Sequence, residues 1–400
     1  MFPFRTVVVG TFLPTILFEI GVGGVLPIIA ATATGFGASI AVAGVLVTLV
    51  PIGHILWDIP AGSLAARIGD RWAMVASGTI AVVAFVLAGL SQGVWMLATA
   101  MLLLGAASAG WGLARQSYLT AITPPLRRAR VLSTLGGVHR IGIFIGPFVG
   151  AGLIVIGSLS WVYWMAAIFS SAAILVVIAA GEDTEGVASE KRVKVALLDV
   201  LRAHWRVFAT IGTVALLISA VRSARNTVLP LWAEHVGISP EQTSIVFGIA
   251  GAVDMLLFYP AGKVMDRMGR LWVGVPAMLV MGSALAFLPL ATTIVPLAIV
   301  AMVLGLGNGM SSGILMTLGA DVAPAEIRPQ FLGVFRVFAD SGGALGPLVI
   351  SGAAALGSIA AGIWAMAGTS LASVGAQAVW VPMYSPHANR TTRRRAGLID

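Results

Sequence analysis

The sequence predicts an all-α polytopic membrane protein, in which twelve transmembrane helices form two pseudo-symmetric six-helix bundles. Three observations lead to this fold class: an apolar composition, a regular series of apolar runs, and an internal repeat. Of the 400 residues, 58% are hydrophobic and only 10% are charged. A water-soluble chain carries roughly 25% charged residues, so most of this chain is expected to lie in lipid.

Twelve apolar runs are long enough to cross a bilayer, because a transmembrane helix needs about 20 mostly apolar residues. Lipid offers the backbone no hydrogen-bond partner, so each run is predicted to be a helix. The first run is too long for the apolar core of a signal peptide, which has about 7–15 residues, and is expected to remain as a span. The predicted spans are 6–29, 39–60, 72–91, 94–119, 132–156, 161–180, 207–232, 243–261, 271–289, 294–318, 331–355 and 359–384.

The basic residues predict the orientation of these spans. Of the 24 Lys and Arg residues, 19 lie at the N-terminus, in the connections after even-numbered spans or in the C-terminal tail, and the other five lie inside spans. The positive-inside rule therefore predicts that both termini are cytoplasmic. The net charge of +8 is assigned to contact with the anionic inner leaflet rather than with nucleic acid. We expect a monomer in the plasma membrane, and the excess of Arg over Lys suggests a bacterial inner membrane.

The longest hydrophilic interval divides the spans six and six. Within it, Leu197, Leu198, Leu201 and Trp205 recur at helical spacing, which predicts a helix on the membrane surface. The predicted parts are an N-terminal bundle at 1–180, a cytoplasmic linker at 181–206, a C-terminal bundle at 207–385 and a basic cytoplasmic tail at 386–400.

A shift of 200 residues aligns the two halves without gaps over several stretches. PAGSLAARIGDR at 60–71 aligns with PAGKVMDRMGRL at 260–271, and GIFIGPFVGAG at 142–152 aligns with GGALGPLVISG at 342–352. Secondary transporters use such repeats of several helices, with the substrate site between the repeats near the membrane midplane.

On these features the chain resembles the major facilitator superfamily over nearly its whole length. The family's loop pattern is G-x-x-x-D-R-x-G-R, and the resemblance implies that this loop latches the cytoplasmic side. Residues 262–270 match it fully, whereas the first-half copy has Ala66 in place of the Asp. Asp58, one turn before that copy, is a candidate substitute. The candidate latch residues are Gly62, Arg67, Gly69, Gly262, Asp266, Arg267, Gly269 and Arg270.

A second pattern, on the fifth span, is similar to the family's antiporter motif, and this resemblance implies export by exchange. Glycines four residues apart let a neighbouring helix approach closely. A proline removes a backbone donor and bends the helix. The pattern predicts a close, bent helix interface, although plain packing accounts for the same glycine spacing. Its residues are Gly142, Gly146, Pro147 and Gly150, with Gly342, Gly346 and Pro347 at the repeat positions.

Eleven charged or titratable side chains fall inside the predicted spans, where an ionisable group costs at least ~2.5–3.5 kcal/mol at the bilayer centre. Glu19, about thirteen residues into the first span, is the first candidate for proton coupling; a permanent ion pair with an arginine such as Arg222 is the alternative. Asp254 and Asp340 are further candidates. The family resemblance implies the same role for Arg115, where the pattern R-x-x-Q-G matches only at its arginine.

Arg222 and Arg225 are three residues apart and therefore share one face of span seven. With the neighbouring Asn226 they are candidates for binding an anionic or hydrogen-bonding substrate, and neutralisation of Glu234 is the alternative. His139 and Arg140 are further substrate-binding candidates. Arg140 occupies the repeat position of Asp340, so the two are expected to share an electrostatic network. Arg336 and Asp340, four residues apart, are expected to pair within span eleven.

These features predict a secondary active transporter, most simply a proton-coupled exporter of small organic molecules that works by alternating access. An importer or uniporter of an organic anion is the main alternative, and a non-transporting receptor is a minor one. No hydrolase elbow, HExxH or P-loop pattern occurs, so we expect no enzymatic activity. Cysteine is absent, which excludes disulfides and thiolate metal sites. No metal or cofactor is expected.

Overall fold

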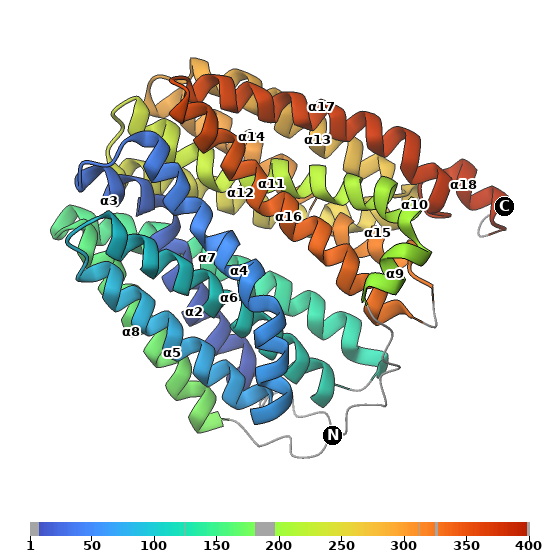
Figure 1. Ribbon diagram of the computed structural model, residues 1–400, viewed down its shortest axis with the longest axis horizontal. Helices are drawn as coiled ribbons and strands as arrows, with labels where there is room; N and C mark the ends of the chain where they lie inside the picture. The colour runs from blue at the N-terminus through green and yellow to red at the C-terminus, as the bar shows by residue number, and fades with distance from the viewer. Residues whose placement is uncertain (1–7, 124, 181–196, 312, 325–326, 398–400) are drawn as a thin grey trace. The chain divides into compact units, whose positions relative to one another are not determined.

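The computed structural model describes residues 8–123, 125–180, 197–311, 313–324 and 327–397 (Figure 1). Every secondary-structure element among these residues is helical. Twelve helical segments within them are long and apolar enough to cross a membrane. The predicted fold class is therefore confirmed, including the number of spans.

Six spans make up the first half of the chain. The first is composite, because Pro27 lacks a backbone N–H and the helix tightens there into a 3₁₀ turn. The elements are η1 (Val8–Phe12, a π-helical turn), α2 (Leu13–Val25), η2 (Leu26–Ile28), α3 (Ile29–Gly35), α4 (Ile40–Ile68), α5 (Asp70–Gly89), α6 (Val94–Ile122), α7 (Pro125–Ile156) and α8 (Leu159–Ala180).

Six further spans make up the second half. The tenth predicted span is interrupted, since α14 ends at Met310 and α15 begins at Ile314. The elements are α9 (Leu197–Ala203), α10 (Trp205–Val207), η3 (Phe208–Gly212, a π-helical turn), α11 (Thr213–His235), α12 (Pro240–Met268), α13 (Leu271–Phe287), η4 (Leu288–Leu290), α14 (Ile294–Met310), α15 (Ile314–Val322), α16 (Arg328–Ala355), α17 (Ile359–Tyr384) and α18 (Arg390–Arg395).

Several helices run past the predicted span ends. α4 continues to Ile68 and α12 to Met268, so most of each loop pattern is helical. The difference has a physical reason: hydropathy marks the edge of the lipid, whereas a helix continues until its backbone is interrupted. The interruptions here are Gly69 (φ 82°) and Gly269 (φ 110°), which adopt left-handed conformations that other residues avoid.

The repeat seen in the sequence is also a repeat in backbone geometry. The π-helical turns η1 and η3 begin 200 residues apart. The left-handed glycines Gly37 (φ 81°) and Gly237 (φ 77°) have the same offset, as do Gly69 and Gly269. Two unusual conformations that recur at one spacing show that the halves share their local structure and not only their composition.

Part of the predicted linker, residues 181–196, lies outside the described residues. The helix predicted from the Leu and Trp spacing is present as α9 and α10. Val200 is buried at 1% exposure, and α9 packs against α16. Trp205, in contrast, is 58% exposed.

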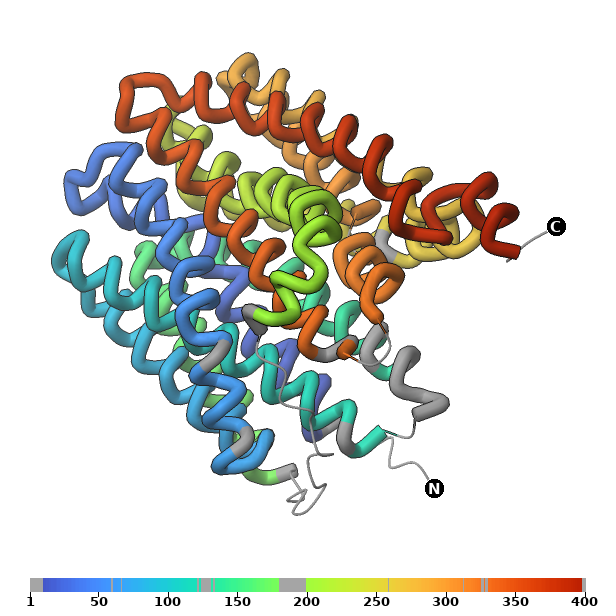
Figure 2. The backbone as a smooth tube through the Cα atoms, turned by 45° about the vertical axis from the view of Figure 1, so that its right-hand side comes forward, coloured from blue at the N-terminus to red at the C-terminus, as the bar shows by residue number. Residues whose placement is uncertain are grey.

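The chain divides into two compact units, Met1–Glu190 with Ala233–Gly248, and Lys191–Trp232 with Ile249–Asp400. In the first unit α2 packs against α7 and α8, and α6 packs against α4 and α5. In the second unit α13 packs against α14 and α17, and α16 packs against α17 (Figure 2). Each unit is thus a helical bundle with its own buried core.

Glycines hold α7 close to α2 in the first unit. A Cβ on Gly146 would lie 2.5 Å from the backbone nitrogen of Gly24, and one on Gly142 would lie 2.9 Å from the carbonyl oxygen of Ile16. Gly150 makes only ordinary contacts, at 3.5 Å. In the second unit, Gly342 and Gly346 of α16 meet the backbone of α11 in the same way. Pro147 and Pro347 lie inside α7 and α16.

Replacement of Gly146 by Ala is expected to lower the free energy of unfolding by about 1–3 kcal/mol, because the added methyl would press on backbone atoms that cannot rotate away. Gly152 on the same helix is the matched control, since a Cβ there meets nothing within 4 Å. Gly152→Ala should be neutral or stabilising by up to ~1 kcal/mol. Thermal unfolding in detergent measures both variants, and equal melting temperatures would contradict the close contact.

Candidate functional site

The first candidate site surrounds Glu19 on α2, within the first unit. Glu19 is buried, at 5% exposure. Its Oε1 accepts a hydrogen bond of 2.8 Å from Nη1 of Arg115 on α6. Nδ1 of His139 on α7 lies 2.7 Å from the same oxygen. This contact is defined by the distance between the two atoms and not by hydrogen-bond geometry. The arginine that pairs with Glu19 is therefore Arg115.

Helix packing explains why these three groups meet. Gly142 lies against Glu19, and His139, three residues earlier, shares that face of α7. On the other side, Phe18 of α2 stacks on Trp111 of α6 with ring centroids 4.6 Å apart. Trp111 precedes Arg115 by one helical turn, so the stacked rings and the ion pair both join α2 to the same face of α6.

This arrangement is suited to holding and releasing a proton. An arginine stays charged, whereas a carboxylate and an imidazole can both exchange a proton. The His139 side chain is 41% exposed, although its Nδ1 is buried beside Glu19. The imidazole therefore connects a buried acid to an exposed surface. Loss of either member of a buried ion pair typically costs about 3–5 kcal/mol, because the remaining charge has no compensation.

The second candidate site lies in the second unit, around Asp254 of α12. Oδ2 of Asp254 accepts hydrogen bonds from Nη1 of Arg225 (3.1 Å) and from Nδ2 of Asn308 (2.6 Å). Oδ1 of Asn308 accepts one from Nε of Arg222 (3.0 Å). Arg225 is 3% exposed. The substrate-binding candidates Arg222 and Arg225 and the proton-coupling candidate Asp254 therefore belong to a single network on α11, α12 and α14.

Asn308 joins this network although its amide side chain is not ionisable, so the sequence-based choice of ionisable candidates did not include it. A Cβ on the adjacent Gly309 would lie 2.5 Å from the carbonyl oxygen of Asp254, and Gly305 meets the backbone of Ala250. α14 therefore touches α12 along a glycine face, which brings the short amide side chain within reach of the carboxylate. An amide beside glycines four residues apart in an apolar run is the sequence signal that identifies such a residue.

The remaining intramembrane candidates make the following local contacts. Asn226 is exposed, although it follows Arg225 in sequence. Arg140 donates from Nη1 to the carbonyl oxygen of Gly136 on its own helix, at 3.1 Å. Arg336 and Asp340 form the predicted pair within α16, with Nε and Oδ2 3.3 Å apart. That pair is partly exposed, at 46% and 26% for the two side chains.

The two loop patterns differ in their ionic contacts. In the second unit, Arg270 donates from Nε and Nη2 to both oxygens of Asp321 on α15, at 3.0 and 3.1 Å. Asp266 is 78% exposed and lies 3.8 Å from Arg270, so Asp321 is the nearer partner. In the first unit Arg67 is exposed, and Asp58 lies 4.0 Å from His54, one turn earlier on α4. A Cβ added at Gly62 or at Gly262 would meet nothing within 4 Å.

The C-terminal segment Ser385–Arg395 is fastened to the second loop, and we name it the tail clamp. The backbone nitrogens of Arg270 and Leu271 donate to the carbonyl oxygens of His387 and Ala388, both at 3.0 Å. Arg393 is 8% exposed and caps the C-terminal end of α12 by donating to the carbonyl oxygens at 266 and 267, at 2.8 and 3.0 Å. The hydroxyl of Ser385 also donates to Asp321, at 2.7 Å.

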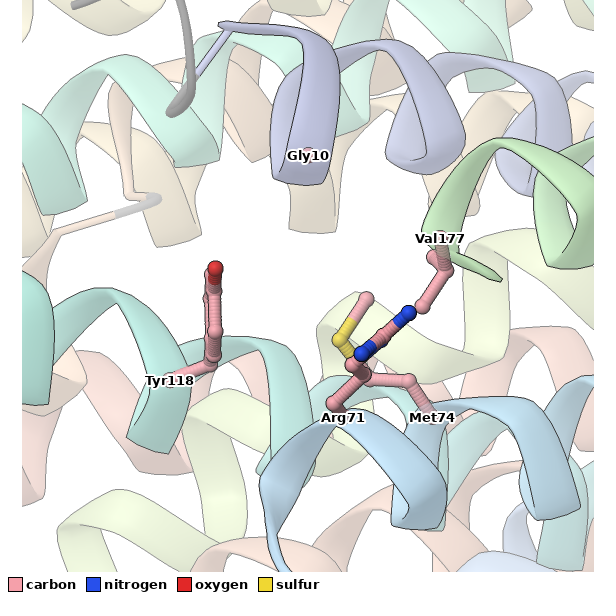
Figure 3. A pocket seen from close by; sticks show the side chains of 5 residues that line it. All are labelled: Gly10, Arg71, Met74, Tyr118 and Val177. Carbon is pink, nitrogen blue, oxygen red and sulfur yellow. The ribbon is translucent and has the colours of Figure 1, made fainter. Parts of the chain in front are cut away.

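A small pocket opens at one end of the first unit, lined by Gly10, Arg71, Met74, Tyr118 and Val177 (Figure 3). The guanidinium of Arg71 extends across it and donates to the carbonyl oxygen of Ile178 on α8, at 2.6 Å. The arginine fastens α5 to α8, so this pocket is not assigned to a substrate. Among the described residues, no three His, Cys, Asp or Glu side chains are grouped as metal ligands.

Twelve spans, a repeated six-helix unit and buried charges inside the spans define the class of this protein as a polytopic membrane transporter. The sequence model of the Major Facilitator Superfamily matches residues 11–347 and 211–398. The chain belongs to this superfamily. Its members and the solved structures that it resembles are transporters and not enzymes.

One curated relative is the tetracycline resistance protein, class H, of Pasteurella multocida, which is 28% identical over 139 residues. The match spans 34% of this chain and 34% of that protein. The fold is similar to that of the nucleoside transporter NupG, with a TM-score of 0.77 and 15% identity over 94% of this chain and 100% of the other. The corresponding values for a D-xylose-proton symporter are 0.74 and 13%, over 97% and 99%.

Proposed function

We propose that this transporter exports small organic molecules across the bacterial inner membrane in exchange for protons. The observation that carries the proposal is the buried contact of Glu19 with Arg115 and His139. A proton on Glu19 removes the charge that holds Arg115, so protonation and the ion pair exclude each other. Such a group has two states that differ in charge, which is what proton coupling requires.

Two further observations favour export. The Gly142-to-Gly150 pattern is similar to the family's antiporter motif, and it lies at the close contact between α7 and α2. The curated relative is a tetracycline resistance protein. The fold alone does not favour a direction, because the similar structures include a proton symporter for D-xylose.

Import or facilitated diffusion of an organic anion is the second candidate function. Arg222 and Arg225 lie in one network on α11, and Arg222 is partly exposed. Guanidinium groups bind carboxylates well, which supports a substrate with an anionic oxygen. This reading predicts uptake by intact cells that is lost in Arg222→Ala.

Transport by everted membrane vesicles distinguishes the two functions. With tetracycline, the cation ethidium and the anion benzoate as probes, an exporter is expected to accumulate at least one probe when respiration acidifies the interior. An uncoupler should abolish that accumulation. Uptake by intact cells, with none in everted vesicles, would contradict export. The same vesicles test the proposed cytoplasmic position of the C-terminus, because trypsin should cleave at Arg394 or Arg395 only in everted preparations.

A further inference from the structure

The tail clamp divides its arginines between an internal contact and an exposed basic face. Arg393 is 8% exposed and caps α12. Arg390, Arg394 and Arg395 of the same helix are exposed. So is Arg267, whose carbonyl oxygen accepts the hydrogen bond from Arg393. We name these four exposed residues, Arg267, Arg390, Arg394 and Arg395, the basic platform.

Chain connectivity places the basic platform at the membrane surface. α17 is a candidate span that ends at Tyr384, and the tail clamp begins at the next residue. α12 and α13 are also candidate spans, and Arg267 lies at the junction between them. Figures 1 and 2 both show α18 beyond the end of α17. Trp272 at the start of α13 is 54% exposed, and tryptophan is enriched where a span meets the headgroups.

We propose that the basic platform binds the anionic headgroups of phospholipids and thereby stabilises the tail clamp on the α12–α13 loop. One guanidinium group can donate two parallel hydrogen bonds to the oxygens of a phosphate. Clustered arginines beside a span attract anionic lipids. The exposed acid in this loop is Asp266, which lies 3.8 Å from Arg270. Among the described residues of the α12–α13 loop and α18, the four arginines of the basic platform outnumber this one exposed acid, so the local charge favours an anionic surface.

The anchored geometry gives the lipid contact a consequence for the loop. The backbone nitrogen of Arg270 donates a hydrogen bond to the carbonyl oxygen of His387, and its side chain donates to Asp321. The hydroxyl of Ser385 also donates to Asp321. Movement of α18 away from α12 would break the contacts of Arg393 and strain those of the loop. Lipid bound to the basic platform therefore opposes release of the loop from the tail clamp.

The test compares the melting temperature of the full-length protein in nanodiscs of phosphatidylcholine and of equimolar phosphatidylcholine and phosphatidylglycerol. Phosphatidylglycerol is expected to raise the melting temperature of the wild type, and high salt is expected to reduce the shift. The double variant Arg390→Gln/Arg395→Gln should lose more than half of this shift. Its matched control is Arg202→Gln/Arg206→Gln, which removes the same charge from exposed positions on α9 and α10. The control should lose less than half of the shift, because these arginines are not attached to the tail clamp.

Two further arms make the result decisive. Arg393→Ala should lower the melting temperature in both lipids and also lose the shift, because the platform is then no longer attached. Inorganic phosphate added in detergent without lipid should give no shift; an equal shift would overturn the assignment to a membrane surface. The proposal would also be overturned if phosphatidylglycerol did not raise the melting temperature of the wild type. It would be overturned as well if Arg390→Gln/Arg395→Gln kept the full shift. This readout needs no substrate and no proton gradient, so its failure is separate from failure of the proposed export.

Discussion

Replacement of Glu19 by Gln is expected to abolish substrate accumulation driven by a proton gradient, with a loss on the order of 100-fold or more. Glutamine has nearly the same shape, and its carbonyl oxygen can still accept the 2.8 Å hydrogen bond from Arg115. It cannot bind or release a proton near neutral pH. Substrate counterflow without a pH gradient should persist, because that exchange needs the conformational change but no proton transfer. Everted vesicles and proteoliposomes loaded with the same probe measure the two activities.

The control for this variant is Glu241→Gln. Glu241 lies at the start of α12 and interacts with Ser239 at 2.5 Å, away from the Glu19 site. It should retain transport driven by the gradient, which shows that the loss is not a general effect of removing a carboxylate. Full gradient-driven accumulation by Glu19→Gln would remove Glu19 from proton coupling. Loss of both gradient-driven transport and counterflow, with an unchanged melting temperature, would instead assign Glu19 to the transport cycle itself.

Replacement of Arg225 by Leu is expected to lower the free energy of unfolding by about 3–5 kcal/mol, since it removes the guanidinium that pairs with the largely buried carboxylate of Asp254. Arg225 is 3% exposed and donates to Asp254 at 3.1 Å. For a chain unit of this size, each 1 kcal/mol lowers the melting temperature by roughly 2–4 °C. The expected fall is therefore on the order of 10 °C in a detergent melting experiment.

The double variant Arg225→Leu/Asp254→Leu separates a structural role of this pair from a functional one. Apolar replacement of both partners of a buried ion pair is often neutral, so most of the lost stability should return. Transport should stay low, because the Asn308 amide then has no carboxylate to contact and Arg222 loses its ordered neighbour. If stability and transport both returned to wild-type values, Asp254 would be a structural residue only. Unchanged stability of the Arg225→Leu variant would contradict the pairing of Arg225 with Asp254.

The number of spans and the repeat follow from local properties of the chain. Hydropathy adds along the sequence, and a bilayer requires each apolar run of about 20 residues to form a helix, whatever its neighbours are. The sharp turns at Gly69 and Gly269 also depend on a local property of the chain, because a left-handed backbone conformation strongly favours glycine. The ends of α4 and α12 are less predictable, because these helices continue past the lipid into polar sequence.

The partners of the buried charges depend on tertiary structure. Each residue along a helix turns by about 100°, so a small change in the rotation of α2 or α6 decides whether Glu19 meets Arg115. The sequence alone offers a permanent ion pair with an arginine such as Arg222 as the alternative to proton coupling, and it does not single out Arg115 as the partner. Asn308 and Asp321 depend on tertiary structure for the same reason. The glycines beside Asn308 indicate a close helix contact but not its partner, and Asp321 is positioned by its hydrogen bonds to Arg270.

By itself, the sequence determined that this chain is a twelve-span protein of two related halves, with glycines at its sharp turns and charges inside its spans. Only the tertiary structure decided that Glu19 lies with Arg115 and His139, that Asp254 lies with Arg225 and Asn308, and that Arg393 caps α12. The physical reason is the range of the interactions. Burial in lipid acts on each segment alone, whereas an ion pair needs two side chains from distant segments to meet within about 4 Å.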